Sequence, residues 1–283
     1  MADQISVPSR VAARITSSLR RFQPILSSAL ARDVNESDTS HIVNDMLSEM
    51  FGYDKYGEIT SEHQIRGTFC DLAVVIEGNL RLLIEVKAIG LSLKDKHLRQ
   101  VVNYAANQGV DWVILTNGVD WHVYKIDFSQ PINEELVIEL NFLEMNLKEK
   151  GILESLYLLT KEGLLKSALP AYYTRKQATN RFILGAILVS EPVLAIVRRE
   201  LRRVAPDVKV STEQVKKVLL QEVLKREVAQ SEFAEEARKK VQRSAGKTIK
   251  TRKKSSDDRA VVSEVIQEQE TPKQNEDVSS AEL

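Results

Sequence analysis

The sequence contains little of what marks a secreted, membrane-bound or zinc-binding protein. Cys70 is the only cysteine in 283 residues. A single cysteine excludes an internal disulfide and a cysteine-rich zinc site, and it fits a reducing compartment. No apolar run approaches the roughly 18 residues of a membrane span, and the beginning of the sequence lacks the apolar core of a signal peptide. We therefore expect a cytoplasmic protein without a membrane partner.

The chain also lacks a net charge. Its 40 basic residues balance its 40 acidic residues, so the overall charge predicts neither a nucleic-acid partner nor a membrane partner. Any field that steers a charged ligand must come from local patches. The four histidines do not have the spacing of metal ligands. With 43% hydrophobic residues, 283 residues suffice for one sizeable globular domain and a smaller one.

Hydrophobic periodicity predicts an α/β domain in the first half of the chain. Apolar residues recur at helical spacing, or follow helix-capping residues, over 9–32, 35–50 and 94–108. Strand patterns occupy 58–66, 69–76, 80–87, 111–116 and 121–126, with a further candidate at 136–142. Asn117-Gly118 between two of these strands is a strong hairpin signal. The order of elements predicts an α/β fold with a mixed sheet flanked by helices.

The second half has a different pattern. From about residue 146 the apolar residues follow helical spacing, and beyond Gly246 the chain is polar, with few apolar residues to bury. We expect an α/β domain over 1–145, a helical domain over 146–245 and a disordered tail over 246–283.

The most informative pattern closes the third predicted strand. Side chains alternate between the two faces of a strand, so Ile84 and Val86 enter a core while Glu85 and Lys87 lie together on the opposite face. Asp71 on the neighbouring strand would add a second carboxylate. Two carboxylates and an ammonium that converge on one small volume are what metal-assisted phosphodiester cleavage requires.

The chemistry of these groups suits magnesium. Mg²⁺ prefers oxygen ligands and binds through one or two carboxylates plus substrate phosphates. Asp71 and Glu85 can supply the carboxylates, the carbonyl of Val86 is a further candidate ligand, and Lys87 can orient the attacking water or steady the transition state. The alternative is structural: Glu85 and Lys87 form an exposed ion pair, and Asp71 is a solubilising charge at a strand edge.

Motif order extends the pattern beyond these three residues. Asp71, Glu85-Val86-Lys87 and Gln100-Val101-Val102-Asn103-Tyr104 stand in the order acid, (D/E)xK, QxxxY. The sequence thus resembles the PD-(D/E)XK nuclease superfamily, and within it the N-terminal nuclease domain of type I restriction enzyme R subunits, over roughly residues 30–145. The resemblance implies that Gln100 and Tyr104 position DNA or the attacking water. The alternative for these two is a solvated glutamine and a tyrosine at the edge of the core.

Two features depart from the family pattern. Cys70 stands where the family has the proline before its aspartate, a position that is not a metal ligand. The acid that the family carries on its first helix could be Glu36 or Glu49. We prefer Glu36 because it stands beside a predicted helix start, and we include it among the candidate metal ligands.

The resemblance implies a Mg²⁺-dependent DNA endonuclease in a restriction or phage-defence setting, with Mn²⁺ as an alternative metal. The R subunits also carry a phosphate-binding GxxxxGK[ST] loop, and no segment of this sequence has that form. The chain is therefore expected to act without a motor of its own, with a recognition or translocase subunit as a candidate partner. Two alternatives stay open: an inactive nuclease fold that serves as a nucleic-acid-binding or scaffolding module, and a nuclease that cleaves RNA.

A basic stretch lies in the helical half. Residues 198–226 contain nine basic and four acidic residues. They form either a phosphate-binding surface or an ordinary solvated helix face, and the sequence favours neither.

Overall fold

The computed structural model describes residues 5–65, 68–149 and 151–244. The chain forms two compact units, Met1–Thr174 (unit 1) and Arg175–Leu283 (unit 2), which we describe separately. The tail predicted over 246–283 lies outside the described residues. Within the described ranges, no helix is both long and apolar enough to cross a membrane.

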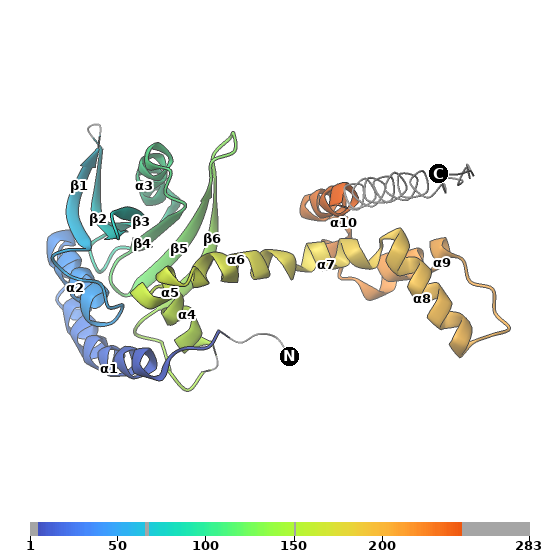
Figure 1. The fold of residues 1–283 in the computed structure, drawn as a ribbon, viewed down its shortest axis with the longest axis horizontal. Coiled ribbons are helices and arrows are strands. Elements are labelled where there is room, and N and C mark those ends of the chain that lie inside the picture. Colours follow the sequence, from blue (N-terminus) through green and yellow to red (C-terminus); the bar gives the residue numbers. More distant parts are fainter. Residues whose placement is uncertain (1–4, 66–67, 150, 245–283) are drawn as a thin grey trace, which may run out of the picture. The chain divides into compact units, whose positions relative to one another are not determined.

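Unit 1 is built on a six-stranded sheet whose strands follow one another in chain order (Figure 1). The strands are β1 (Ile59–Ile65), β2 (Thr68–Ile76), β3 (Asn79–Val86), β4 (Trp112–Thr116), β5 (Asp120–Asp127) and β6 (Asn133–Asn141). Neighbouring strands are antiparallel except β3 and β4, which are parallel. The predicted fold class, a mixed sheet flanked by helices, is confirmed.

Helix α3 (Asp95–Gln108) connects the parallel pair. Parallel neighbours cannot be joined by a tight hairpin and need a crossover of this kind. The helix ends at Gly109, which has φ +65° and whose N–H donates to the carbonyl of Ala105. Glycine adopts this left-handed backbone conformation without strain, which explains why a glycine ends the helix.

The two faces of the sheet bury different side chains. Ile84 and Val86 of β3 belong to a core shared with α1 (Ser9–Ala31) and α2 (Glu36–Glu49). Leu83 belongs to a second core, beneath α3. Figure 1 shows the helices on these opposite faces. The predicted alternation along β3 is thus confirmed, but a helix covers the face that carries Glu85.

The helices that follow β6 complete the first core. Leu156 and Leu158 of α4 (Ile152–Leu158) are fully buried in it. The Tyr53 hydroxyl donates to the Leu159 carbonyl at 2.5 Å. At the start of α5 (Lys161–Leu165), Glu162 accepts two hydrogen bonds from the guanidinium of Arg14. Residues after 145 therefore pack on the α/β core, and the division expected at residue 145 falls inside unit 1.

The described part of unit 2 contains only helices, as the sequence pattern predicts. Helix α6 (Ala168–Ala178) crosses the division between the units. It is followed by α7 (Arg181–Leu188), α8 (Glu191–Val204), α9 (Thr212–Val218), the π-helix η1 (Leu219–Val223), α10 (Arg226–Gln230) and a helical segment over 232–244. The core of this unit is small, with Leu194 of α8 its most buried side chain at 1% exposure.

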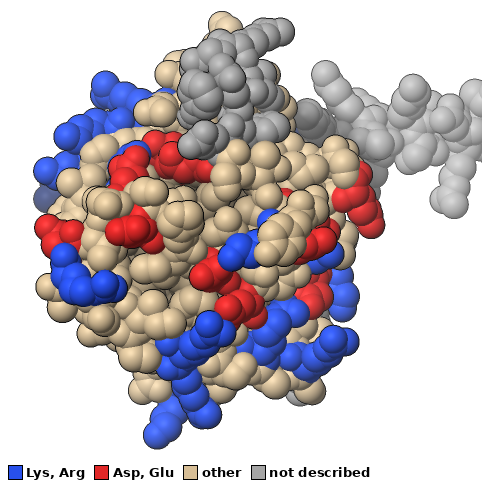
Figure 2. Space-filling model, turned by 90° about the vertical axis from the view of Figure 1, so that its left-hand side faces the viewer, with Lys and Arg blue, Asp and Glu red and all other residues tan. Residues whose placement is uncertain are grey.

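Charges of both signs share the surface of unit 1. Figure 2 shows the face that α1, α2 and β1 form, where patches of basic and acidic side chains alternate with uncharged residues. Neither sign dominates this face, which agrees with the balanced charge of the chain.

Candidate active site

Strands β2 and β3 place Asp71 beside the end of β3. The antiparallel register pairs Leu72 with Ile84, so the next residues along, Asp71 and Glu85, lie opposite each other. The backbone N–H of Val86 donates to Oδ2 of Asp71 at 2.7 Å. Lys87 directly follows β3, and its N–H donates to the Thr116 carbonyl at the end of β4. The three motif residues therefore converge on the α3 face of the sheet.

Glu85 is a buried acid with an incomplete set of partners. Its side chain is 2% exposed, and its Oε1 lies 2.8 Å from Nζ of Lys87. Its Oε2 is buried and, among the described residues, no group donates a hydrogen bond to it. Burial raises the pKa of Glu85 to about 7, the hydrogen bond from Lys87 lowers it, and the charge of Asp71 raises it. The environment thus favours the protonated acid, or a cation at the unpaired oxygen.

Lys87 lies among several carboxylates. Its Nζ is 3.4 Å from Oε1 of Glu36, in addition to its contact with Glu85. Burial alone would lower the pKa of Lys87, but the hydrogen bond to Glu85 and the charges of Glu85, Asp71 and Glu36 outweigh it and raise the pKa. Lys87 is therefore a permanently charged ammonium at neutral pH, suited to binding an anion or orienting water.

The structure distinguishes the two candidate helix acids. Glu36 is the first residue of α2, held there by its neighbour Asn35, whose side chain caps the helix by accepting from the N–H of Asp38. Glu49, at the other end of α2, pairs with Arg21 of α1. Glu36 is thus the α2 acid that the fold brings to Lys87.

Helix α3 begins next to this cluster. The pKa of His97 is lowered by burial and by the charges of Lys96 and Lys87, while Glu36 raises it, so its ring lies within electrostatic range of the site. Gln100, one turn further along, is exposed. Tyr104 is 1% exposed and packs in the core beneath α3. The two QxxxY residues thus have different environments, one in solvent and one in the core.

Cys70 lies behind the site and not in it. The side chain is fully buried, and its thiol donates to the carbonyls of Leu72 and Ile84. Burial and the charge of Glu85 raise its pKa to about 12. A thiol in this state packs as a small apolar residue and is neither a nucleophile nor a metal ligand.

Hard oxygen donors of the site fit a divalent cation. Asp71, Glu85 and Glu36 carry three negative charges when ionised against one positive charge on Lys87, so the cluster has an excess of negative charge. The unpaired Oε2 of Glu85 is a free donor atom inside this field. Among the described residues, no three acidic, His or Cys side chains already stand as a metal-binding group. Lys87 contacts both Glu85 and Glu36, so the fit is to an ion held by one or two carboxylates.

Sequence reasoning identified the β4–β5 turn only as a hairpin. In the structure, Asn117 of this turn is 4% exposed and its side-chain amide donates to the Leu91 carbonyl of the β3–α3 loop. The carboxylate of Asp120, the first residue of β5, accepts a hydrogen bond from the side-chain amide of Asn141 at the end of β6. The Asn-Gly pair in the sequence indicated the turn. It could not indicate these hydrogen bonds, because Leu91 and Asn141 are distant from the turn in sequence.

Comparisons with known proteins agree with the motif order. No curated protein and no solved structure matches the chain. Residues 39–138, about a third of the chain, match the family model described as the type I restriction enzyme R protein N terminus (HSDR_N). The matched segment runs from α2 to β6 and includes Asp71, Glu85, Lys87, Gln100 and Tyr104. The resemblance inferred from the motifs is confirmed for this segment, which is similar to the nuclease-like N-terminal domain of type I restriction enzyme R proteins.

Proposed function

We propose that unit 1 is a Mg²⁺-dependent nuclease that hydrolyses phosphodiester bonds of DNA, in a restriction or phage-defence setting. The observation that carries the proposal is the convergence of Asp71, Glu85 and Lys87 at the end of β3, inside the segment that matches a nuclease-like family. A cytoplasmic location follows from that setting, as do DNA and a recognition or translocase subunit as partners.

Each residue has a role that its position allows. Asp71 and Glu85 would hold the metal, with the Val86 carbonyl as a further ligand and Glu36 as the acid from α2. The bound ion would lower the pKa of a water molecule and offset charge on the scissile phosphate. Lys87 would orient the attacking water or stabilise the charge that develops on the phosphate. Gln100, exposed one turn after His97, would contact the strand or the water, and the buried Tyr104 would position α3.

Cleavage of supercoiled plasmid and of single-stranded DNA, with Mg²⁺ or Mn²⁺, tests the proposal. Asp71→Ala and Lys87→Ala should each lower the cleavage rate by at least about 100-fold, the scale on which single electrostatic or acid-base groups contribute. Glu134→Ala and Lys148→Ala change exposed residues of the same charges and should leave the rate unchanged. Equal rates for the wild type and for both site variants would refute the site assignment. A labelled RNA of the same sequence separates DNA from RNA cleavage.

A non-catalytic role is the second candidate, and one observation favours it. Lys87 already forms ion pairs with both Glu85 and Glu36, as it would in a fold that no longer binds metal. Calorimetric titration with Mn²⁺ distinguishes the two functions. A nuclease should give a binding signal that disappears in Asp71→Ala, whereas a scaffold should give no signal at this site.

A further inference from the structure

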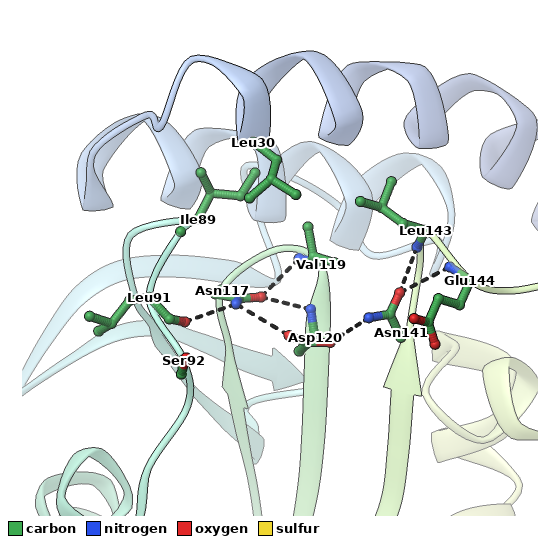
Figure 3. A pocket seen from close by; sticks show the side chains of 11 residues that line it. Leu30, Ile89, Leu91, Ser92, Asn117, Val119, Asp120, Asn141, Leu143 and Glu144 are labelled. Atoms are coloured by element: carbon green, nitrogen blue, oxygen red, sulfur yellow. Dashed lines mark hydrogen bonds between the residues drawn. The ribbon is translucent and has the colours of Figure 1, made fainter.

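A recess lies on the same edge of the sheet as the candidate active site. It has a volume of about 340 Å³ and is lined by the β3–α3 loop, the β4–β5 turn, the end of β6 and the end of α1 (Figure 3). Its wall begins at Ile89, two residues after Lys87. The N–H of Lys87 also donates to the carbonyl of Thr116, the residue before Asn117. Ligands of α/β sheets commonly bind outside the carboxyl ends of parallel strands, and β3 and β4 both end here.

One side of the recess is a row of hydrogen-bonded polar groups. The Asn117 amide donates to the carbonyl of Leu91 at 3.0 Å and to Oδ2 of Asp120 at 3.4 Å. The Asn141 amide donates to Oδ1 of Asp120 at 2.7 Å, and its own oxygen accepts the N–H groups of Leu143 and Glu144. Figure 3 shows this row running from the β3–α3 loop to the end of β6. The network fixes the carboxylate of Asp120 in the centre of the row.

The carboxylate of Asp120 can accept further hydrogen bonds. An ionised carboxylate offers about four acceptor positions, and the two side-chain amides occupy one position on each oxygen. Asp120 is partly exposed, so its remaining acceptor positions are accessible to a ligand. A ligand with two adjacent N–H donors therefore matches this group.

The opposite side of the recess is apolar. Leu30 of α1, Ile89, Val119 and Leu143 lie between the polar row and α1 in Figure 3. The recess thus offers apolar contacts for the face of a flat ring and hydrogen-bonding groups for its edge. Its volume is at the lower end of small-molecule sites, a size that suits one ring system.

The charges that line the recess argue against a phosphate. Asp120 and Glu144 are its ionisable residues, and neither lysine nor arginine is among the described residues that line it. An acidic recess repels phosphate and accepts N–H donors. In a nucleic-acid strand those donors belong to the bases, and single-stranded or extruded bases are read through their Watson–Crick edges.

We infer that this recess is a base-binding subsite that takes a guanine from the substrate strand, with Asp120 accepting the two N–H donors on its Watson–Crick edge. The inference rests on the proposed function for its substrate class, since the subsite would hold a nucleotide near the bond to be cut. It assigns base preference to residues outside the metal-binding cluster.

Binding of labelled oligonucleotides tests the subsite without cleavage. Two fluorescein-labelled 12-mers of dT carry at their centre either one deoxyguanosine or one deoxyinosine, which lacks the exocyclic amino group. Fluorescence anisotropy is measured with the full chain in EDTA. The wild type should bind the guanine strand at least about 5-fold more tightly than the inosine strand, the lower limit for loss of a paired contact to a base. Equal affinity for the two strands would overturn the inference.

Two variants and a control assign the effect to the recess. Asp120→Asn replaces one acceptor oxygen by a donor and should reduce the affinity ratio to about 1. Leu30→Trp enlarges a residue that is 39% exposed and should fill the recess, weakening binding of the guanine strand to the level of the inosine strand. Leu136→Trp makes the same change at a 40% exposed position of β6 outside the recess and should leave the ratio intact. Thermal unfolding checks that each variant is folded. If Asp120→Asn is unfolded, a ratio preserved in Leu30→Trp is sufficient to reject the subsite.

The outcomes separate the subsite from the nuclease proposal. Asp71→Ala lies outside the recess and should keep the guanine preference while losing cleavage. Cleavage by the wild type without any guanine preference rejects the subsite and supports the nuclease. A guanine preference in a protein that does not cleave rejects the nuclease and supports the subsite.

Discussion

Replacing Glu85 by glutamine should stabilise the folded protein at alkaline pH. The raised pKa of Glu85, about 7 against 4.5 for the ordinary side chain, means that the folded state prefers the protonated acid. Well below pH 4.5 the carboxyl is protonated in both states and does not reduce the free energy of unfolding. The reduction grows as the pH rises from 4.5 to 7 and is constant above pH 7. This difference between the two pKa values lowers the free energy of unfolding by about 3 kcal/mol at pH 8. Glutamine has nearly the same shape and carries no charge at any pH.

Urea unfolding of wild type and Glu85→Gln, monitored by circular dichroism from pH 4.5 to 8, measures this cost. The free energy of unfolding of the variant should exceed that of the wild type by less than about 1 kcal/mol at pH 4.5 and by about 3 kcal/mol at pH 8. Glu134→Gln, at an exposed position of β6, is the control and should stay within about 0.5 kcal/mol of wild type at every pH.

A lower stability of Glu85→Gln at pH 8 would refute the reasoning. It would mean that the contact with Lys87 stabilises the fold by more than the burial of the carboxylate costs. The proposed metal site provides a second check. If it binds Mg²⁺, an excess of the ion should raise the melting temperature of the wild type, since an ion bound to the folded state stabilises it, and should have less effect on Glu85→Gln.

Three further predictions follow from other contacts. Lys87→Met should lower the free energy of unfolding by about 1 to 3 kcal/mol at pH 8 and by much less at pH 5, because the change leaves an ionised Glu85 buried without its ammonium; urea unfolding at both values measures it. Tyr53→Phe should cost about 1 to 2 kcal/mol at all pH values below 9, because it leaves the buried carbonyl of Leu159 without its donor; an unchanged urea midpoint would contradict the contact. Cys70 should react with a thiol reagent at pH 8 only as fast as the protein unfolds, because its thiol is buried and un-ionised; rapid labelling of the native protein would show otherwise.

The fold could largely be predicted because its signals are local. The alternation along 80–87, the Asn117-Gly118 turn and the glycine that ends α3 each depend on a few adjacent residues. The place of α4 and α5 could not be predicted in this way. Their leucines have helical spacing whether they form a separate bundle or pack on a sheet, and the contacts that decide, from Arg14 and Tyr53, come from residues more than 100 positions away.

The proximity of Asp71, Glu85 and Lys87 could be predicted from the sequence, but the environment of these side chains could not. Motif order indicates that Asp71, Glu85 and Lys87 converge, because strand register follows from the hydrophobic pattern. Motif order does not indicate that the side chain of Glu85 is only 2% exposed, nor that Glu36 contacts Lys87. Both features depend on how the helices pack on the sheet. The hydrophobic alternation of a single strand does not indicate which element covers that strand.

The place of β3 in the sheet has a consequence for how a substrate must be engaged. With two strands on one side of it and three on the other, β3 is among the last parts of unit 1 to open during local fluctuations. Glu85 lies on this rigid strand and Lys87 directly follows it, so in the proposed nuclease the backbone of neither residue would shift to meet a misplaced phosphate. In the proposed nuclease, alignment of a nucleic acid would then come from the strand itself, or from a partner that bends and delivers it.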